Sequence, residues 1–157
     1  MQLLLGRGTL ENMMAEQLLL VAGLPGCGKT GYLRRLETEG WRIFDDFKAN
    51  ARQDSSHFAA SRHYDSLIQD LRDGRRCVVA DIDFCRESAR AEAEHVLRRA
   101  LPDVVFAWQF FENHPERCAF NIRRRNRHSI EADLRKLEEF ASVYSVPEGV
   151  ETMPIGG

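Results

Sequence analysis

The chain has 157 residues, a mass of 18.0 kDa and a formal net charge of −2, with 43% apolar and 29% charged residues. These values are typical of one soluble globular domain. They exclude a disordered tail, a fibre, a repeat array and a protein that coats nucleic acid by charge alone. Nineteen of the 22 basic residues are arginines, and the lysines are Lys29, Lys48 and Lys136.

Short apolar runs alternate with helical patterns along the chain. Strands are expected at 18–22, 41–44, 77–82, 104–111 and 152–155, and helices at 30–39, 54–72, 87–100, 115–125 and 130–144. This alternation predicts an α/β fold of three layers around a parallel sheet. Because an apolar strand follows directly after residues 14–17, we interpret 1–13 as an N-terminal extension with little structure and 14–157 as a single domain.

The four cysteines indicate reduced thiols. Cys27, Cys77, Cys85 and Cys118 show neither a disulfide framework nor the spacing of zinc ligands. We therefore expect a cytoplasmic protein. No apolar run approaches the roughly 20 residues of a membrane span, so no membrane partner is expected. Cys27 has two interpretations, a redox-sensitive thiol at a helix terminus or a small side chain that fills a loop position.

A phosphate-binding loop follows the first strand. Gly23-Leu24-Pro25-Gly26-Cys27-Gly28-Lys29-Thr30 matches Gly-x-x-x-x-Gly-Lys-[Ser/Thr] between a strand and a helix. The glycines allow backbone N–H groups to surround a phosphate, and the positive end of the helix dipole faces the same anion. The motif predicts that ATP binds along the whole loop, with Lys29 at the β- and γ-phosphates and Thr30 ligating Mg²⁺.

Other classes of nucleotide-binding protein are excluded by what the sequence lacks. It has no Asn-Lys-x-Asp for guanine and no Leu-Ser-Gly-Gly run of the transporter ATPases. It is too short for the second, helical domain of the ring-forming ATPases. A compact kinase remains, in which one domain binds ATP and an acceptor hydroxyl.

Carboxylates follow two of the predicted strands. Asp45 and Asp46 come after the second strand, at the edge of a parallel sheet where ligands bind. Either could take the proton of an attacking hydroxyl, and we favour Asp45; the alternative is a pair of exposed loop acids. Asp81 ends the third strand, as an acid of the Mg²⁺ shell does, and Asp83 points to the same side if the strand continues.

An arginine-rich segment is expected to form a lid near 117–129. Five arginines lie within eleven residues without an acid between them: Arg117, Arg123, Arg124, Arg125 and Arg127. Guanidinium groups clamp triphosphate oxygens and stabilise transition-state charge. We expect Arg124 to act in catalysis and Arg123 and Arg127 to contact the nucleotide. The alternative is a solvated helix face that downstream acids neutralise.

The chain resembles P-loop kinases of the polynucleotide 5′-kinase type, a group that includes zeta-toxin-like and small-molecule kinases. The resemblance spans about 17–145, and its marks are the phosphate loop and Asp45-Asp46-Phe47-Lys48, which is similar to Asp-Asp-Tyr-Arg in that family. The resemblance implies the sheet order 2-3-1-4-5 and Asp45 as general base. It also implies that Lys48 contacts an acceptor phosphate and that Asp46 and Arg86 lie near the substrate.

Two motifs depart from that family. In 78–83 the acid Asp81 matches the family's Asp-Thr-Asn, but Ile82 and Asp83 do not. The lid pattern Arg-Asn-x-x-Arg is not reproduced cleanly, which leaves the roles of the individual lid arginines open.

The sequence predicts an enzyme that moves the γ-phosphate of ATP to a hydroxyl, with Mg²⁺ as cofactor. The acceptor is a nucleic-acid 5′-end or a small molecule. Basic and aromatic residues in 48–64 are candidate acceptor contacts, or else they form an ordinary amphipathic helix. One alternative function is a nucleotide-binding ATPase or switch without an acceptor. Another is an interaction module in which ATP is structural.

Overall fold

The computed structural model describes residues 16–45, 57–125 and 129–156, with side chains from Tyr64 onward in the second range. The expected N-terminal extension, 1–13, lies outside these residues, as do Asp46, Lys48 and Arg127. No helix in the described ranges combines the length and the apolar character that a membrane span requires.

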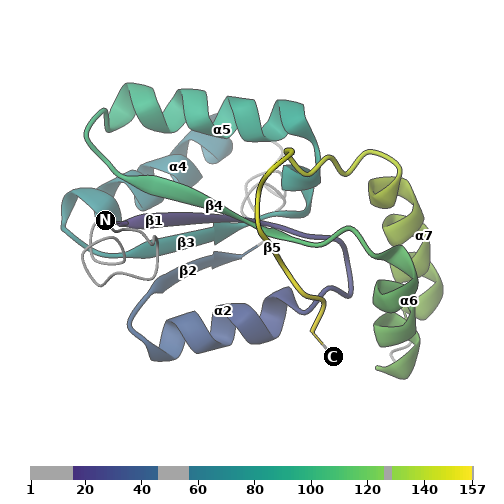
Figure 1. Cartoon of the computed structure of the whole chain (residues 1–157). Helices are drawn as coiled ribbons and strands as arrows, with labels where there is room; N and C mark the ends of the chain where they lie inside the picture. Colours follow the sequence, from purple (N-terminus) through teal and green to yellow (C-terminus); the bar gives the residue numbers. More distant parts are fainter. Residues whose placement is uncertain (1–15, 46–56, 126–128, 157) are drawn as a thin grey trace.

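Five parallel strands form one sheet in the order β2-β3-β1-β4-β5, which confirms the predicted α/β fold and sheet order (Figure 1). The strands are β1 (Leu18–Ala22), β2 (Arg42–Asp45), β3 (Cys77–Ala80), β4 (Phe106–Phe111) and β5 (Thr152–Met153). In the centre, Leu20 of β1 lies opposite Val79 of β3 and Trp108 of β4. All residues of β1 and β3 are buried, because helices cover the central strands of such a sheet on both faces.

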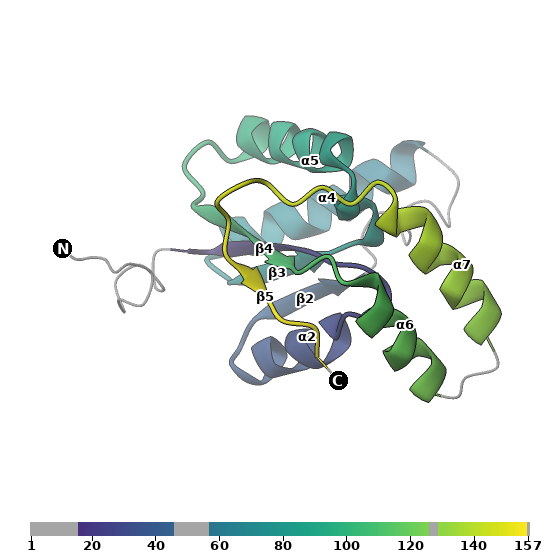
Figure 2. The same ribbon diagram turned by 45° about the vertical axis from the view of Figure 1, so that its right-hand side comes forward.

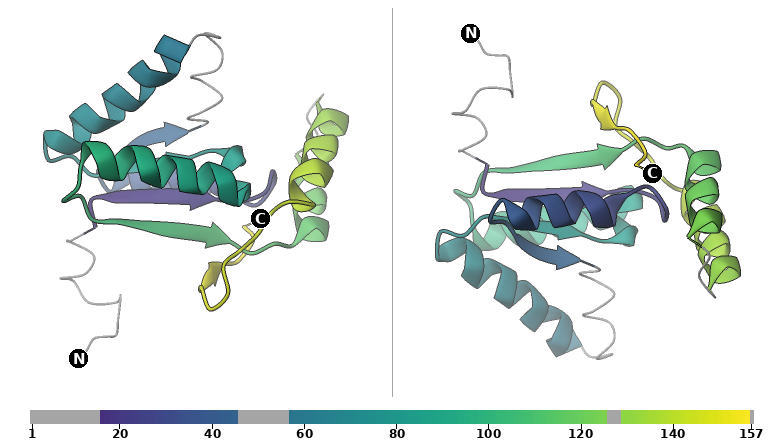
Figure 3. Two further views of the ribbon diagram at one scale, coloured as in Figure 1. Left: turned by 90° about the horizontal axis from the view of Figure 1, so that it is seen from above. Right: turned by 90° about the horizontal axis from the view of Figure 1, so that it is seen from below.

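The helices make the two outer layers and a separate hairpin. Helix α2 (Lys29–Thr38) lies on one face of the sheet, and α4 (His57–Arg72) and α5 (Glu87–Ala100) lie on the other (Figures 1 and 3). Helices α6 (Pro115–Arg124) and α7 (Ile130–Ala141) stand beyond the carboxyl ends of the strands as an antiparallel pair (Figure 2). We call this pair the lid hairpin.

The third strand is shorter than expected. It ends at Ala80, and the chain turns into the 3₁₀ helix η2 (Ile82–Cys85). The Asp81 side chain causes this turn, because its Oδ1 accepts the N–H of Asp83 at 2.8 Å. The strand therefore does not continue to Asp83, so the condition under which Asp83 would point to the same side as Asp81 is not met.

The last part of the chain returns to the sheet. Helix α7 ends at Ala141, and Tyr144 beyond it is buried. Its hydroxyl donates to the carbonyl oxygen of Phe111 and lies 3.3 Å from that of Ala22. Strand β5 then pairs with the end of β4, where Phe110 lies opposite Thr152. Residues 153–156, which we call the C-terminal segment, pass from there toward the phosphate loop.

Candidate active site

The phosphate loop, residues 23–28, joins β1 to α2. Gly26 and Gly28 have φ angles of +83° and +101°, in the left-handed region that glycine adopts without steric cost. Gly28 is the N-cap of α2 and has no side chain to offer to the first N–H groups of the helix. Those groups depend on water or a ligand, and an anion is the ligand that a helix N-terminus favours.

Lys29 closes the loop on itself. Its Nζ donates to the carbonyl oxygen of Gly23 at 2.6 Å, and the side chain is half-buried. An incoming phosphate offers a charged acceptor, and hydrogen bonds between charged groups are stronger than those to a carbonyl. The ammonium group is therefore held at the loop, and Lys29 also lines the pocket described next.

A pocket of about 200 Å³ opens above the loop. Its walls come from the loop and α2, from the end of β2, from the start of η2, and from the lid hairpin. The lining residues are Leu24, Pro25, Gly26, Cys27, Gly28, Lys29, Thr30, Asp45, Ile82, Ile122, Arg125, Asp133 and Lys136. The structure thus places Asp45 in the same cavity as residues 24–30 of the predicted phosphate-binding motif.

The two candidate carboxylates stand at neighbouring strand ends. Asp45 is the exposed last residue of β2 and pairs in register with Ala80, the residue before Asp81. Asp81 is fully buried and does not line the pocket, and one of its oxygens accepts the Asp83 N–H. The exposed Thr30 is the second residue of α2 and lines the pocket.

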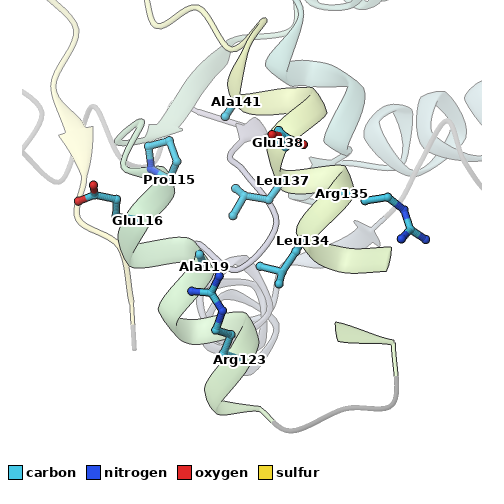
Figure 4. Close-up of a pocket in the computed structure, with 9 residues that line it drawn as sticks. All are labelled: Pro115, Glu116, Ala119, Arg123, Leu134, Arg135, Leu137, Glu138 and Ala141. Atoms are coloured by element: carbon cyan, nitrogen blue, oxygen red, sulfur yellow. The ribbon is translucent and has the colours of Figure 1, made fainter. Parts of the chain in front are cut away.

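The described arginines of the predicted cluster lie in different surroundings. Arg125 lines the phosphate pocket. The Arg124 guanidinium instead lies 5.6 Å from the ring centre of the exposed Phe120. Arg123 lines a different cavity, a groove of about 580 Å³ between α6 and α7 (Figure 4).

Two further candidates have structural partners. Arg86 pairs with Glu139 of α7 at 3.3 Å, and its guanidinium lies 5.1 Å from the Phe140 ring centre. Tyr64, at the end of the candidate acceptor segment, packs against the core, as the amphipathic interpretation of this helix expects. Burial there raises the pKa of Tyr64 to about 12.

Three buried thiols lie in or beside the phosphate loop. Cys27, Cys85 and Cys118 are free, and the Cys85 thiol lies 3.5 Å from the carbonyl oxygen of Gly23. Burial raises the pKa of Cys85 and of Cys118 to about 12, and it also raises the pKa of Cys27 despite the nearby Lys29 ammonium. A thiol is the unreactive form, so the structure favours Cys27 as a small packing residue.

Sequence reasoning assigned no site role to Asp133, Lys136 or the C-terminal segment, and it named Asn121 only with Arg124, as one register of the imperfect lid pattern. Asn121 of α6 is buried, and its Nδ2 donates to the carbonyl oxygens of Gly26 at 2.9 Å and Gly156 at 2.6 Å. Its sequence signal was its position three residues after Cys118, on the buried face of the helix. Lys136 was detectable only as one of three lysines in an arginine-rich chain.

The sheet order, the phosphate loop and the hairpin beyond the strand ends define a P-loop kinase-like fold. The chain is similar to a gluconokinase from Sinorhizobium meliloti 1021, with a TM-score of 0.52 and 18% identity over 90% of this chain and 82% of that one. It is 27% identical over 116 residues to an uncharacterized protein of Acanthamoeba polyphaga mimivirus, which covers 72% of this chain and 75% of the viral protein. No family model matches the chain.

Proposed function

We propose that this protein is an ATP-dependent phosphotransferase that moves the γ-phosphate of ATP to the hydroxyl group of an acceptor. The observation that carries this proposal is the shared pocket of Asp45 and the phosphate loop. A carboxylate beside bound phosphates can accept the proton of an attacking hydroxyl. The kinase-like fold supports the same conclusion.

The residues of the loop suit a triphosphate. Two glycines with positive φ, the N-terminus of α2 and the Lys29 ammonium converge on one small cavity. Thr30 lines the pocket, and its hydroxyl is the group that would hold Mg²⁺, which would supply positive charge at the phosphates. Asp81, the other Mg²⁺ candidate from the sequence, is fully buried and does not line the pocket. The described residues contain no cluster of three or more His, Cys, Asp or Glu arranged for a metal. The ion would therefore depend on phosphate oxygens and water for its other ligands.

A second cavity adjoins the loop at Gly28 and suits the nucleoside. It has a volume of about 640 Å³ and lies between α2, the end of β4 and the C-terminal segment. Its walls are mainly apolar and include Tyr32, Phe111 and Pro154. Pockets of this size and character hold nucleotide-sized ligands.

Transfer would proceed by displacement at the γ-phosphorus. The acceptor oxygen forms the new P–O bond, its proton passes to Asp45, and the bond to the leaving oxygen of ADP breaks. Arg125 and Lys136 line the pocket and would stabilise the charge on the transferred group. From the sequence, Arg124 remains a candidate for catalysis, and Arg123 and Arg127 remain candidates for contacts with the nucleotide. Asp46, Lys48 and Arg86 remain candidates for binding the acceptor.

A transfer screen tests this function. ATP labelled in its γ-phosphate is offered with 5′-hydroxyl oligonucleotides, nucleosides, sugars and sugar acids, and labelled products are resolved. With an acceptor that the screen identifies, Asp45→Asn should lower transfer by at least about 100-fold and leave ATP affinity nearly unchanged. Asp103→Asn is the matched control, because Asp103 is exposed and precedes β4 at the opposite end of the sheet.

The runner-up function is an ATPase or switch without an acceptor. The loop residues that line the pocket support this function as well, because a phosphate loop can bind ATP without an acceptor. That function predicts no labelled product from any acceptor and equal ATP hydrolysis by the wild type and by Asp45→Asn. Transfer at the wild-type rate by Asp45→Asn would overturn the assignment of Asp45 as the base.

A further inference from the structure

Two backbones pack directly against the phosphate loop from outside. A Cβ atom on Gly26 would lie 2.5 Å from the carbonyl oxygen of Cys118 in α6. A Cβ atom on Gly28 would lie 3.0 Å from the Cα atom of Gly156. The two glycines of positive φ thus mark the places where the lid hairpin and the C-terminal segment approach the loop. The loop lies between them.

A series of hydrogen bonds holds the C-terminal segment in this place. Glu112 N–H donates to the carbonyl oxygen of Met153 at 2.9 Å, and Ile155 N–H donates to the Glu112 carboxylate at 3.2 Å. Gly156 N–H then donates to the carbonyl oxygen of Cys27 at 2.9 Å. The segment therefore starts on the sheet and ends on the phosphate loop.

Asn121 joins all three parts. Its side chain comes from α6, and its two amide N–H groups go to one carbonyl of the loop, Gly26, and one of the C-terminal segment, Gly156. The opposite orientation of the amide would set its oxygen against two carbonyl oxygens, so the hydrogen-bonding chemistry fixes the orientation. Its Oδ1 has no partner among the described residues, so the amide acts here as a donor.

The C-terminal segment also forms a wall of the cavity that we assign to the nucleoside. Met153, Pro154, Ile155 and Gly156 line it, opposite Tyr32 and Arg35 of α2. The phosphate loop is held at both ends by β1 and α2, which flank it in the chain. The wall formed by the C-terminal segment is instead held by hydrogen bonds from other parts of the fold. Asn121 is the side chain that links the wall to the loop.

We propose that Asn121 is a positioning residue that holds the C-terminal segment against the phosphate loop, and so sets the nucleoside cavity relative to the phosphate site. This inference rests on the proposed function, because it takes ATP as the ligand of both cavities. It predicts that Asn121 contributes more to the binding of ATP than to the binding of inorganic tripolyphosphate, which needs the loop alone.

Calorimetry with Mg²⁺–ATP and with Mg²⁺–tripolyphosphate tests this difference. Asn121→Ser keeps one donor but is too short to reach both carbonyls, and Asn121→Asp keeps the shape but sets a carboxylate against them. We expect each variant to lose about tenfold or more in ATP affinity, the equivalent of one hydrogen bond, and less than about threefold in tripolyphosphate affinity. Asn113→Asp, in an exposed position before α6, is the control.

Equal losses for the two ligands, or no loss for either, would overturn the positioning role. Circular dichroism of each variant shows whether the chain is folded. If the wild type binds neither ligand, the proposed function fails, and amide exchange decides the inference separately. The Gly156 N–H should then exchange at least about tenfold faster in Asn121→Ser than in the wild type, while Leu20 N–H in the central strand is unchanged. Unchanged protection of Gly156 would overturn the inference.

Discussion

The ammonium group of Lys29 donates a hydrogen bond to the carbonyl oxygen of Gly23, with a distance of 2.6 Å between nitrogen and oxygen. The lysine that the motif assigns to phosphate therefore spans its own loop, from the first helical residue back to the end of β1. In the proposed function, a bound triphosphate would use the same donor as this internal hydrogen bond. Lys29 would then have one role in the stability of the loop and another in ligand binding.

Replacing Lys29 should affect the two roles to different extents. We expect Lys29→Met to lower ATP affinity by about 100-fold, since it removes charge-assisted hydrogen bonds to phosphate worth about 1.5–3 kcal/mol each. The free energy of unfolding should fall by only about 1 kcal/mol, for one hydrogen bond to a carbonyl. Calorimetry and denaturant unfolding measure these quantities. Arg34→Met, on the exposed side of the same helix, is the control, and undiminished ATP affinity in Lys29→Met would contradict the loop assignment.

The lid arginines should differ in their effect on transfer. Arg125 lines the pocket, whereas Arg124 lies over Phe120. We expect Arg125→Ala to lower the transfer rate by about 100-fold, as the loss of one preorganised transition-state donor does. Arg124→Ala should change the rate by less than about threefold, because its guanidinium packs on an aromatic ring outside the pocket. Steady-state transfer assays measure the rates of the two variants. A larger loss of rate in Arg124→Ala than in Arg125→Ala would support Arg124 as the catalytic arginine.

Gly26 and Gly74 form a natural pair for measuring the packing of the loop against α6. Their φ angles are +83° and +84°, but a Cβ atom meets the Cys118 carbonyl oxygen only at Gly26, while Gly74 has no atom of the described residues within 4 Å. We expect Gly74→Ala to cost about 1–2 kcal/mol, the strain of a left-handed alanine. Gly26→Ala should cost about 1–3 kcal/mol more, because α6 must move away. Denaturant unfolding measures both, and equal costs would mean that α6 does not pack against the loop in solution.

The buried thiols predict a loss of stability at alkaline pH. Burial raises the pKa of Cys77, Cys85 and Cys118 from 9.0 to about 12. Above about pH 9 the unfolded chain loses these protons while the folded chain keeps them, so the free energy of unfolding falls by roughly 1 kcal/mol per pH unit for each thiol. The stabilisation is complete below pH 9 and is lost as the pH rises toward 12.

Denaturant unfolding of the wild type and of Cys85→Ala tests this prediction at about pH 8 and about pH 10. The variant has a cavity and should be less stable at both values, but the difference between them should be smaller than in the wild type. Parallel pH dependences would show that the Cys85 thiol does not titrate as its burial requires.

Local patterns were sufficient for the elements that position the site. The phosphate loop is a continuous motif, and its flanking strand and helix follow from an apolar run and a helical period. The boundary at Asp81 could not be predicted in this way, because a side-chain hydrogen bond to Asp83 ends the strand within an apolar run. The lid arginines show the same limitation. Successive helical residues point in directions about 100° apart, and only the packing of α6 against α7 and the loop decides which of them faces the pocket.

The sequence by itself determined the α/β alternation, the phosphate loop and the presence of a carboxylate after the second strand, because each depends on neighbouring residues. The resemblance supplied the sheet order. Tertiary structure alone decided that Arg125 and Lys136 share the pocket with Asp45, and that Asn121 joins Gly26 to Gly156. These contacts connect residues that are far apart in the chain, and a pairing of that kind leaves no periodic or local signal in the sequence.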